Sequence, residues 1–299
     1  MATSESAIGT VIVSYESQAV LPRLLASLAR YEPETPVVVV DNASPSGQPD
    51  ISAYRREGGV PGNLVDLVVL PENRGYGVAC NIGVERLRRY GPRYLAFLNP
   101  DIRLAGPSLT ELTEALDARP RVGVASGVVV DEEGRRVHSV WGPNSQLRAL
   151  WFSSAWPGRR ARALIRRLMR RGLSSSRTLL EDLRSEGHVL GGVMVVRAVC
   201  FDEVHGFDED FFLYWGDADL CERIRVSGAE VRILDCTPFV HAPASGSKGI
   251  DDEQRWEWYS EGARTFARKH LSPGQAQQLE AALELGHRLR QLRTQRPSR

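Results

Sequence analysis

The feature that most constrains the fold is a set of short apolar runs that stop abruptly at polar residues. Residues 37–40 are all valine and stop at Asp41, and residues 94–98 are followed by an Asn-Pro-Asp sequence that ends at Asp101. Runs of this length suit buried strands, and leucines at helical spacing follow the first run, residues 8–14. Strands that alternate with helices predict a mostly parallel sheet, whose ligands bind beyond the carboxyl ends of the strands.

The same pattern continues along the chain and predicts an α/β fold with a mostly parallel central sheet flanked by helices. We expect strands over residues 8–14, 37–40, 64–70, 94–98, 191–197 and 231–234, and helices over about 77–89 and 218–227. A hairpin is expected over residues 122–130, ahead of the turn sequence 131–134. Beyond Asp251 the pattern is helical and strongly charged, and residues 291–299 are expected to fray.

Composition sets the size and class of the protein. The chain has 299 residues, 42% of them hydrophobic, enough to bury a core as one large domain or two fused halves. No apolar run approaches the ~20 residues that span a bilayer, and residues 1–7 lack the apolar segment of a secretory signal. The cysteines include no C-x-x-C pair, which argues against structural zinc and fits reduced thiols in the cytosol. We therefore expect a soluble protein, or one that rests on a membrane surface.

Two acids stand beside an aromatic segment late in the chain. Residues 211–215 are Phe-Phe-Leu-Tyr-Trp, and Asp217 and Asp219 follow them. Apolar walls beside a carboxylate suit a catalytic base. Together with Asp101, the segment suggests that one acid holds a metal, that another takes a proton, and that the reaction is group transfer to a hydroxyl.

Three other features each have a functional and a structural interpretation. Gly75 and Gly77 precede a predicted helix, where they let the backbone approach a phosphate or simply form a tight turn. Asp41 could accept the imide N–H of a pyrimidine or belong to a turn. His241 could share a divalent cation with Asp101 or be structural. No G-x-G-x-x-G follows the first strand and there is no Walker loop, which counts against a dehydrogenase and an NTPase.

The order of these segments resembles family 2 glycosyltransferases, which have the GT-A fold. The similarity covers roughly residues 8–247 and is nearest to a branch of bacterial rhamnosyltransferases that act on polyprenyl-diphosphate-linked N-acetylglucosamine, as in mycobacterial cell-wall synthesis. It rests on residues 10–15, 37–44, 73–83, 99–101, 191–197 and 207–222 and on His241. It implies an inverting, metal-dependent transfer of a sugar, L-rhamnose from dTDP-rhamnose, to a hydroxyl of a lipid-linked saccharide in cell-envelope polysaccharide synthesis.

The resemblance also assigns roles to residues. The nucleotide-sugar donor would contact Ser14, Tyr15, Asp41, Asn73, Gly75, Asn99 and Asp101. Asp101 and His241 would hold Mg²⁺ or Mn²⁺, and Asp217 would be the catalytic base. The acceptor would lie against Gly191, Gly192, Trp215 and Asp219, although a turn at the start of a strand explains the two glycines almost equally well.

Two positions depart from the pattern of that family. Asn99 stands where the first acid of the D-x-D element is expected, so one carboxylate fewer holds the cation. Gly216 stands where an acid precedes the base, which leaves open how Asp217 is oriented. A transferase for galactofuranose or N-acetylglucosamine on a growing polysaccharide, and a weakly catalytic nucleotide-sugar-binding scaffold, are therefore kept as alternatives.

By the same resemblance the chain divides into three parts. Residues 1–125 would form the nucleotide-sugar-binding half, and residues 126–250 the acceptor-binding and catalytic half with an Arg-rich insertion at about 145–185. Residues 251–299 would form a C-terminal helical extension.

The Arg-rich insertion is a candidate membrane contact. Seven arginines and no acid lie from Arg159 to Arg171, around an apolar stripe with spacing i, i+3, i+4 and i+7. Such a helix suits an anionic membrane, although a solvated helix that packs its stripe on the protein is equally compatible. A lipid-linked acceptor favours the inner face of the cell membrane and a peripheral, cytoplasmic enzyme. No nucleic-acid-binding module accompanies the charge, and nothing in the sequence indicates the oligomeric state.

Overall fold

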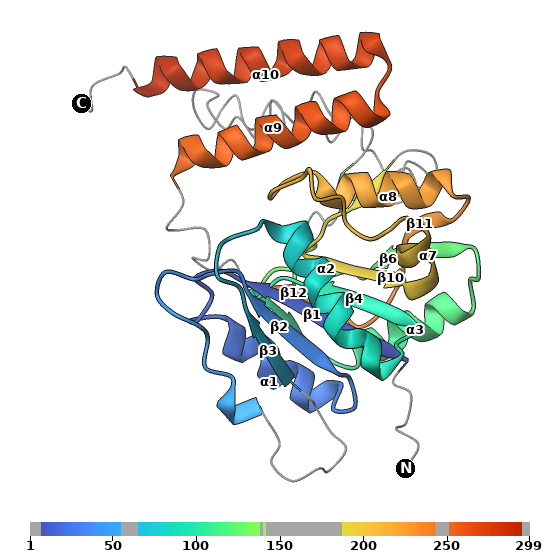
Figure 1. Cartoon of the computed structure of the whole chain (residues 1–299). Helices are drawn as coiled ribbons and strands as arrows, with labels where there is room; N and C mark the ends of the chain where they lie inside the picture. The colour runs from blue at the N-terminus through green and yellow to red at the C-terminus, as the bar shows by residue number, and fades with distance from the viewer. Residues whose placement is uncertain (1–6, 55–64, 138–139, 142–186, 243–250, 295–299) are drawn as a thin grey trace.

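A seven-stranded sheet forms the centre of the molecule (Figure 1). The computed structural model describes residues 7–54, 65–137, 140–141, 187–242 and 251–294. In spatial order the strands are β11 (Glu230–Ile233), β6 (Val122–Ser126), β10 (Val193–Arg197), β4 (Tyr94–Leu98), β1 (Ile8–Ser14), β2 (Val37–Asp41) and β3 (Val65–Val69). β6 falls in the segment expected to form a hairpin, and each of the other strands lies within two residues of an expected strand.

Most neighbouring strands of this sheet run parallel. β1 pairs with β2 and β4, β2 with β3, and β11 with β6, all in parallel. The exception is β10, which is antiparallel to both β4 and β6. The prediction of a mostly parallel α/β sheet is confirmed. Because β10 runs in the opposite direction, its first residue, Val193, lies opposite Leu98 at the end of β4.

Helices cover both faces of the central sheet (Figure 1). They are α1 (Leu21–Tyr31), α2 (Tyr76–Leu87), α3 (Ser108–Asp117), α7 (Ala198–Glu203) and α8 (Gly216–Val226), with short 3-10 helices at Ser52–Tyr54 and Arg88–Tyr90. Val37 and Val39 of β2 pack in the layer of α1 and α3, whereas Val38 and Val40 pack in the layer of α2 and α8. A sheet buried on both faces explains why its strands are continuous apolar runs.

Two smaller sheets were not predicted. β5 (Ile102–Leu104), β12 (Phe239–His241) and β7 (Val129–Val130) form one, and β8 (Val140–Trp141) pairs with β9 (His188–Val189). The expected hairpin over residues 122–130 is wrong, because β6 joins the central sheet and β7 the three-stranded one. A tight turn forms just beyond it, where the Gly134 N–H donates to the Asp131 carbonyl at 3.0 Å. Strands of two or three residues are too short to show a period in the sequence.

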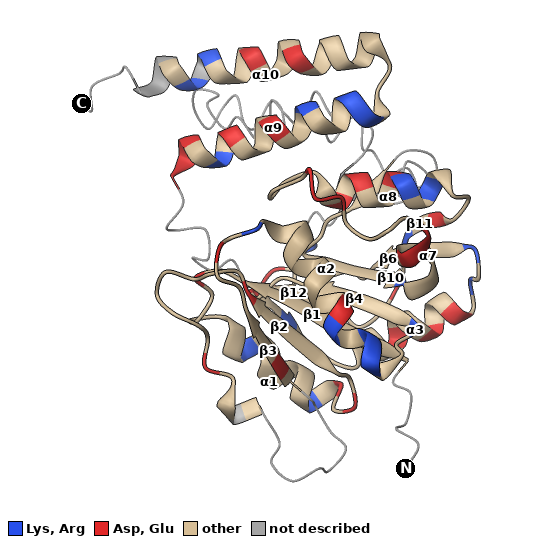
Figure 2. Cartoon of the chain, in the orientation of Figure 1, with Lys and Arg blue, Asp and Glu red and all other residues tan. Residues whose placement is uncertain are grey.

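The C-terminal extension is a pair of helices, α9 (Asp252–His270) and α10 (Pro273–Thr294), which lies above α8 in Figure 1. The Trp215 ring, just before α8, lies 5.6 Å from the Tyr259 ring and 5.2 Å from the Phe266 ring of α9. The expected fraying from residue 291 is wrong for residues 291–294, which are helical. In Figure 2 acids gather at the starts of α8 and α9 and basic residues at their ends, as the helix dipole favours.

Among the residues that the structure describes, no helix is both long and apolar enough to cross a bilayer. The basic insertion from Arg159 to Arg171, which was expected to contact a membrane, lies outside the residues that the structure describes.

The buried carboxylate of Glu32 joins α1 to α3. It accepts hydrogen bonds from the backbone N–H groups of Leu109 (2.8 Å) and Thr110 (3.1 Å) and from the Thr110 hydroxyl (2.6 Å). Because α3 follows Pro107 and has no side-chain cap of its own, Glu32 satisfies N–H groups that the first turn leaves unpaired. Burial raises the pKa of Glu32, and the hydrogen bonds from Thr110 and Leu109 oppose that rise.

We predict that Glu32→Ala lowers the free energy of unfolding by about 2 kcal/mol, because buried N–H groups of α3 lose their acceptor. Glu32→Gln keeps one acceptor oxygen and should lose less. Urea denaturation followed by circular dichroism measures both, with Glu34→Ala, an exposed residue two positions on, as the control. Equal midpoints for Glu32→Ala and Glu34→Ala would contradict this role.

Candidate active site

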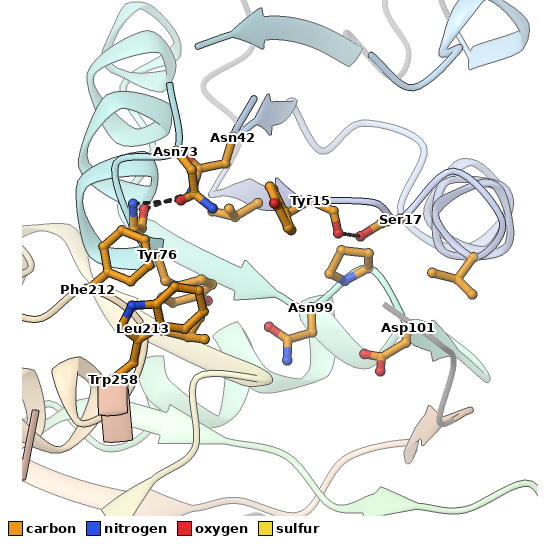
Figure 3. A pocket seen from close by; sticks show the side chains of 14 residues that line it. Tyr15, Ser17, Asn42, Asn73, Tyr76, Asn99, Asp101, Phe212, Leu213 and Trp258 are labelled. Carbon is orange, nitrogen blue, oxygen red and sulfur yellow. Dashed lines mark hydrogen bonds between the residues drawn. The ribbon is translucent and has the colours of Figure 1, made fainter. Parts of the chain in front are cut away.

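A pocket of about 180 Å³ opens at the carboxyl edge of the central sheet. Strands β1, β2 and β4 end there and deliver Tyr15, Asn42 and Asn99 to its wall. Figure 3 shows these side chains around one opening with Asp101, Phe212 and Trp258. All the residues predicted to contact the donor line this pocket except Ser14 and Asp41.

Asp101 and His241 meet at this edge although 140 residues separate them in the sequence. The His241 Nε2 lies 3.1 Å from the Asp101 Oδ2. The backbone sets this contact, because His241 pairs with Ile102 between β12 and β5, and the Ala242 N–H donates to the Asp101 carbonyl at 3.1 Å. The hydrogen bond that the Asp101 carboxylate accepts raises the pKa of His241, against the effect of burial.

The atoms of this pair suit a divalent cation. The other carboxylate oxygen, Asp101 Oδ1, is buried and has no hydrogen-bond partner among the described residues. One carboxylate and one imidazole are too few to enclose a metal, and the described ranges contain no group of three or more His, Cys, Asp or Glu side chains that could hold one. The remaining ligands would have to come from phosphates and water, which is the usual arrangement for Mg²⁺.

A second wall of the pocket is a loop held by amides. The Asn42 Nδ2 donates to the Asn73 Oδ1 at 2.8 Å and to the Gly75 carbonyl at 3.1 Å, and the Arg74 N–H donates to the Asn42 Oδ1 at 3.0 Å. Gly75 has a φ of +84°, and a Cβ at this position would lie 2.4 Å from the carbonyl oxygen of Phe212. Both facts require glycine here.

The first amide of α2 is already used. The Tyr76 N–H donates to the same Phe212 carbonyl at 2.7 Å, so it is not available to a phosphate. This favours the structural interpretation of Gly75, a tight turn, over the phosphate site that was the alternative. Donor contact at Gly75 stays a prediction, now through the pocket wall rather than through this amide.

Ser14 and Asp41 are the two predicted donor residues that do not line the pocket. Ser14 is fully buried and Asp41 is 1% exposed. The Asp41 carboxylate accepts hydrogen bonds from the Ser44 hydroxyl (2.6 Å) and the Ser44 N–H (3.1 Å), which closes the turn after β2. The turn interpretation of Asp41 is therefore correct, and contact with a nucleotide base stays a prediction. Asn42, the next residue, takes the position in the wall.

Asp217 is joined to the pocket edge through Gly191 and Gly192. The Gly191 N–H donates to the Asp217 Oδ2 at 3.1 Å, and the Ala218 N–H donates to the other oxygen at 2.9 Å. The Asn99 N–H in turn donates to the Gly192 carbonyl at 3.0 Å. These bonds orient Asp217 without an acid at position 216, the point that the sequence left open. Each carboxylate oxygen keeps a further lone pair.

Tyr76 links the two sides of the site. Its ring lines the pocket, and its hydroxyl donates to the Gly191 carbonyl at 3.0 Å. Burial, with Cys80 and Asp217 nearby, raises the pKa of the Tyr76 phenol, so that it stays a donor near neutral pH.

The structure corrects the assignment of Trp215 and Asp219 to the acceptor site. Trp215 is 1% exposed and belongs to the core beneath α9. Asp219 is fully buried, and its carboxylate pairs with Arg223 and His270, each at 2.7 Å. Residues two apart in a helix point to different sides, so Asp219 faces the core while Asp217 faces Gly191.

Sequence reasoning did not assign Tyr76, Phe212, Leu213 or Trp258 to the site. Phe212 was identified only as an apolar neighbour of Asp217, and Trp258 lies in a segment predicted merely as helix. Both line the pocket. The one available signal was the concentration of aromatic residues around residue 256, because aromatic side chains that are not in the core often line ligand pockets.

The combination can support group transfer at a carbon bound to phosphate. A carboxylate and an imidazole suit a cation beside phosphates, and a second carboxylate is oriented by backbone amides and connected to the pocket through Gly191 and Tyr76. The carboxylate and imidazole could bind the phosphate that leaves, through a cation, and the second carboxylate could accept a proton.

Two curated proteins are similar to the chain. It is 27% identical over 235 residues to the N-acetylglucosaminyl-diphospho-decaprenol L-rhamnosyltransferase of Mycobacterium tuberculosis, covering 73% of this chain and 70% of that protein. It is 24% identical over 205 residues to the rhamnosyltransferase WbbL of Escherichia coli K12, covering 66% of this chain and 72% of that protein.

The fold is also found among solved structures. The mannosyltransferase PcManGT from Pyrobaculum calidifontis, solved in complex with GDP-Man and Mn²⁺, superposes with a TM-score of 0.55 at 18% identity. The match covers 99% of this chain and 78% of that one, and it establishes the GT-A fold.

Two family descriptions match consecutive parts of the chain. Residues 170–243 match the N-terminal domain of galactosyltransferase, a segment that includes Asp217 and His241. Residues 10–170 match glycosyl transferase family 2. This second match spans more than half of the chain. It includes the pocket-lining residues at the ends of β1, β2 and β4, from Tyr15 to Asp101. The chain therefore belongs to glycosyl transferase family 2, and it is a glycosyltransferase.

Proposed function

We propose that this glycosyltransferase transfers L-rhamnose from dTDP-rhamnose to a hydroxyl of a polyprenyl-diphosphate-linked saccharide, with inversion at the anomeric carbon and with Mg²⁺ or Mn²⁺ as cofactor. The two curated relatives support the sugar, because both are rhamnosyltransferases. The mycobacterial relative supports the acceptor class, because its name specifies an N-acetylglucosaminyl-diphospho-decaprenol. The product would enter cell-envelope polysaccharide synthesis.

The observation that carries the proposal is that Asp101 meets His241 at a pocket whose lining residues Tyr76 and Asn99 are connected to Asp217 through Gly191 and Gly192. Asp101 and His241 come from different halves of the sequence and lie 3.1 Å apart. Asp217 is fixed by two backbone amides, and one of them belongs to Gly191, whose carbonyl accepts the Tyr76 hydroxyl. A donor diphosphate at the first pair would leave its sugar between the two acids.

Asp217 would act as the base in a single displacement. The acceptor oxygen forms a bond to the anomeric carbon of the donor, and its proton passes to the Asp217 carboxylate. The bond from the anomeric carbon to the diphosphate breaks, and its electron pair leaves with the nucleoside diphosphate. Attack from the side opposite the leaving group inverts the anomeric carbon.

Asp101 and His241 would hold the cation, with the donor phosphates as further ligands. When bound, a divalent cation offsets the negative charge that grows on the leaving diphosphate. The Asp101 Oδ1, buried without a hydrogen-bond partner among the described residues, is the atom best placed to bind it. Asn99, Asn73 and Tyr15 supply neutral polar groups at the pocket wall, which can orient a sugar or ribose without adding charge.

A second donor is favoured by one specific observation. The match of residues 170–243 to a galactosyltransferase domain fits a galactose or galactofuranose donor. A direct comparison of donor sugars tests both proposals. Turnover is measured with a synthetic short-chain polyprenyl-diphosphate N-acetylglucosamine and with dTDP-rhamnose, UDP-galactofuranose or UDP-N-acetylglucosamine. Transfer from a UDP-sugar and none from dTDP-rhamnose would contradict the proposed donor.

We predict that Asp217→Asn lowers turnover by on the order of a hundredfold or more and leaves donor binding intact, because an amide cannot accept the acceptor's proton. Steady-state kinetics measures turnover, and calorimetry measures donor affinity. Asp219→Asn is the comparison. It weakens the contacts of a fully buried carboxylate with Arg223 and His270, so it should instead lower the free energy of unfolding, by about 3 kcal/mol. Near-normal turnover of Asp217→Asn would mean that another group is the base.

Removing the metal should abolish activity. We predict that exhaustive chelation stops turnover, that Mn²⁺ or Mg²⁺ restores it, and that Asp101→Ala or His241→Ala weakens donor binding only when metal is present. Donor affinity is titrated with and without Mn²⁺. Asp235→Ala, which removes the same charge from an exposed position, is the control. Turnover that survives chelation would show that basic side chains, and not a cation, neutralise the leaving group.

We also propose that the enzyme is cytoplasmic and peripheral on the inner face of the cell membrane, held there by the arginines from Arg159 to Arg171. A lipid-linked acceptor would require this location. Each basic residue near an anionic leaflet contributes about 1 kcal/mol, so three contacts shift partitioning by roughly two orders of magnitude.

The prediction is tested by sedimentation with liposomes. The native chain should sediment with anionic and not with neutral liposomes, less so as salt rises. A variant with Arg162, Arg166, Arg167 and Arg170 changed to Gln should lose most of this binding. Equal sedimentation of both proteins with anionic liposomes would show that the arginines do not make the contact.

A further inference from the structure

An aromatic pair from two distant segments, Phe212 and Trp258, lines the pocket that contains Asn99 and Asp101. The two rings lie 4.8 Å apart and are tilted by 44°. Trp258 belongs to α9 in the C-terminal extension and is only partly buried. Figure 3 shows the pair, with Leu213, on the side of the pocket away from Asp101. We call Phe212 and Trp258 the aromatic wall.

The aromatic wall is held in place from behind. The carbonyl of Phe212 accepts the Tyr76 N–H at 2.7 Å, which fixes this residue against the start of α2. α9 is pressed against the same segment, because a Cβ at Gly262 would lie 2.5 Å from the Tyr214 carbonyl oxygen. The neighbouring Tyr259 is fully buried against Trp215. Trp258 therefore reaches the pocket from a docked helix and not from a loose terminus.

The aromatic wall is connected to Asp217 through Tyr76 and Gly191. The Tyr76 N–H donates to the Phe212 carbonyl, and the Tyr76 hydroxyl donates to the Gly191 carbonyl. The Gly191 N–H in turn donates to the Asp217 carboxylate. Asp101, which His241 contacts, lies on the other side of the pocket (Figure 3). If the Asp101 and His241 pair holds the donor phosphates, the aromatic wall is left to contact the acceptor, which must approach Asp217.

We propose that the aromatic wall is a platform for the acceptor, on which the C–H face of the saccharide ring nearest the reacting hydroxyl stacks, and that Trp258 determines acceptor affinity. An indole offers a large, rigid apolar face at low cost in side-chain entropy, and pockets of this kind use such faces with a few polar groups for orientation. The inference rests on the proposed function, since it assumes that a saccharide hydroxyl is the nucleophile.

Kinetics on the full chain tests the proposal. The probe is the synthetic short-chain polyprenyl-diphosphate N-acetylglucosamine, varied at saturating donor. Trp258→Ala should raise the acceptor KM on the order of tenfold, with kcat and the donor KM changed less than about twofold, because stacking acts on binding and not on the proton transfer. Trp258→Phe keeps an aromatic face and should recover most of the affinity. Glu257→Ala, exposed on the same helical turn, is the matched control.

Calorimetry with the same probe and no donor tests this proposal separately from the proposal that dTDP-rhamnose is the donor. Weaker binding by Trp258→Ala than by the native chain and Trp258→Phe, with unchanged melting temperatures, supports the platform whichever sugar is transferred. Equal binding by all variants, or a native chain that does not bind the probe, overturns it. A rise in the donor KM alone also overturns it, because the wall would then belong to the donor. A native chain that binds the probe but transfers no rhamnose contradicts only the proposed donor.

Discussion

The site depends on one antiparallel strand. In a sheet of parallel strands every carboxyl end lies at the same edge, so Tyr15, Asn42 and Asn99 lie around one pocket there. β10 is reversed between β4 and β6, and its amino end therefore reaches that edge as well. The Asn99 N–H donates to the Gly192 carbonyl, which fixes this end, and the N–H of the preceding residue, Gly191, donates to the Asp217 carboxylate. The reversed strand thus connects Asp217, from the second half of the chain, to the edge where the pocket opens.

The sequence was sufficient for the elements whose pattern is local. The strands that end at Asp41 and Asn99 are runs buried on both faces, and such runs are visible without any alignment. The residues alone left the meeting of Asp101 with His241 as one of two interpretations, which only the family resemblance decided, because the sheet that joins them is made of strands of two or three residues. Trp258 was missed for a related reason. Nothing in the helical period of α9 distinguishes a residue that lines a pocket from one that packs in the core.

The error at Asp219 shows how two acids close in sequence can have separate tasks. Asp217 is in the first turn of α8 and is met by backbone amides. Asp219 points into the molecule, where Arg223 also donates to the Val204 and Gly206 carbonyls, and where His270 arrives from the end of α9. The contacts of Asp219 with His270 and Arg223 therefore join the C-terminal extension to α8, the helix that also carries Asp217. The two carboxylates in one turn have different surroundings, and only the packing distinguishes them.

The docking of α9 has a thermodynamic consequence. Trp258 belongs both to α9 and to the pocket, so any local opening of that helix would be coupled to occupancy of the pocket. A ligand that touches Trp258 binds the docked form alone and stabilises it by RT ln(1 + [L]/Kd). Amide hydrogens of α9 would then exchange more slowly as the pocket fills, although most of that helix lies far from the ligand. Hydrogen exchange in the C-terminal extension would in this way indicate whether substrate occupies the pocket.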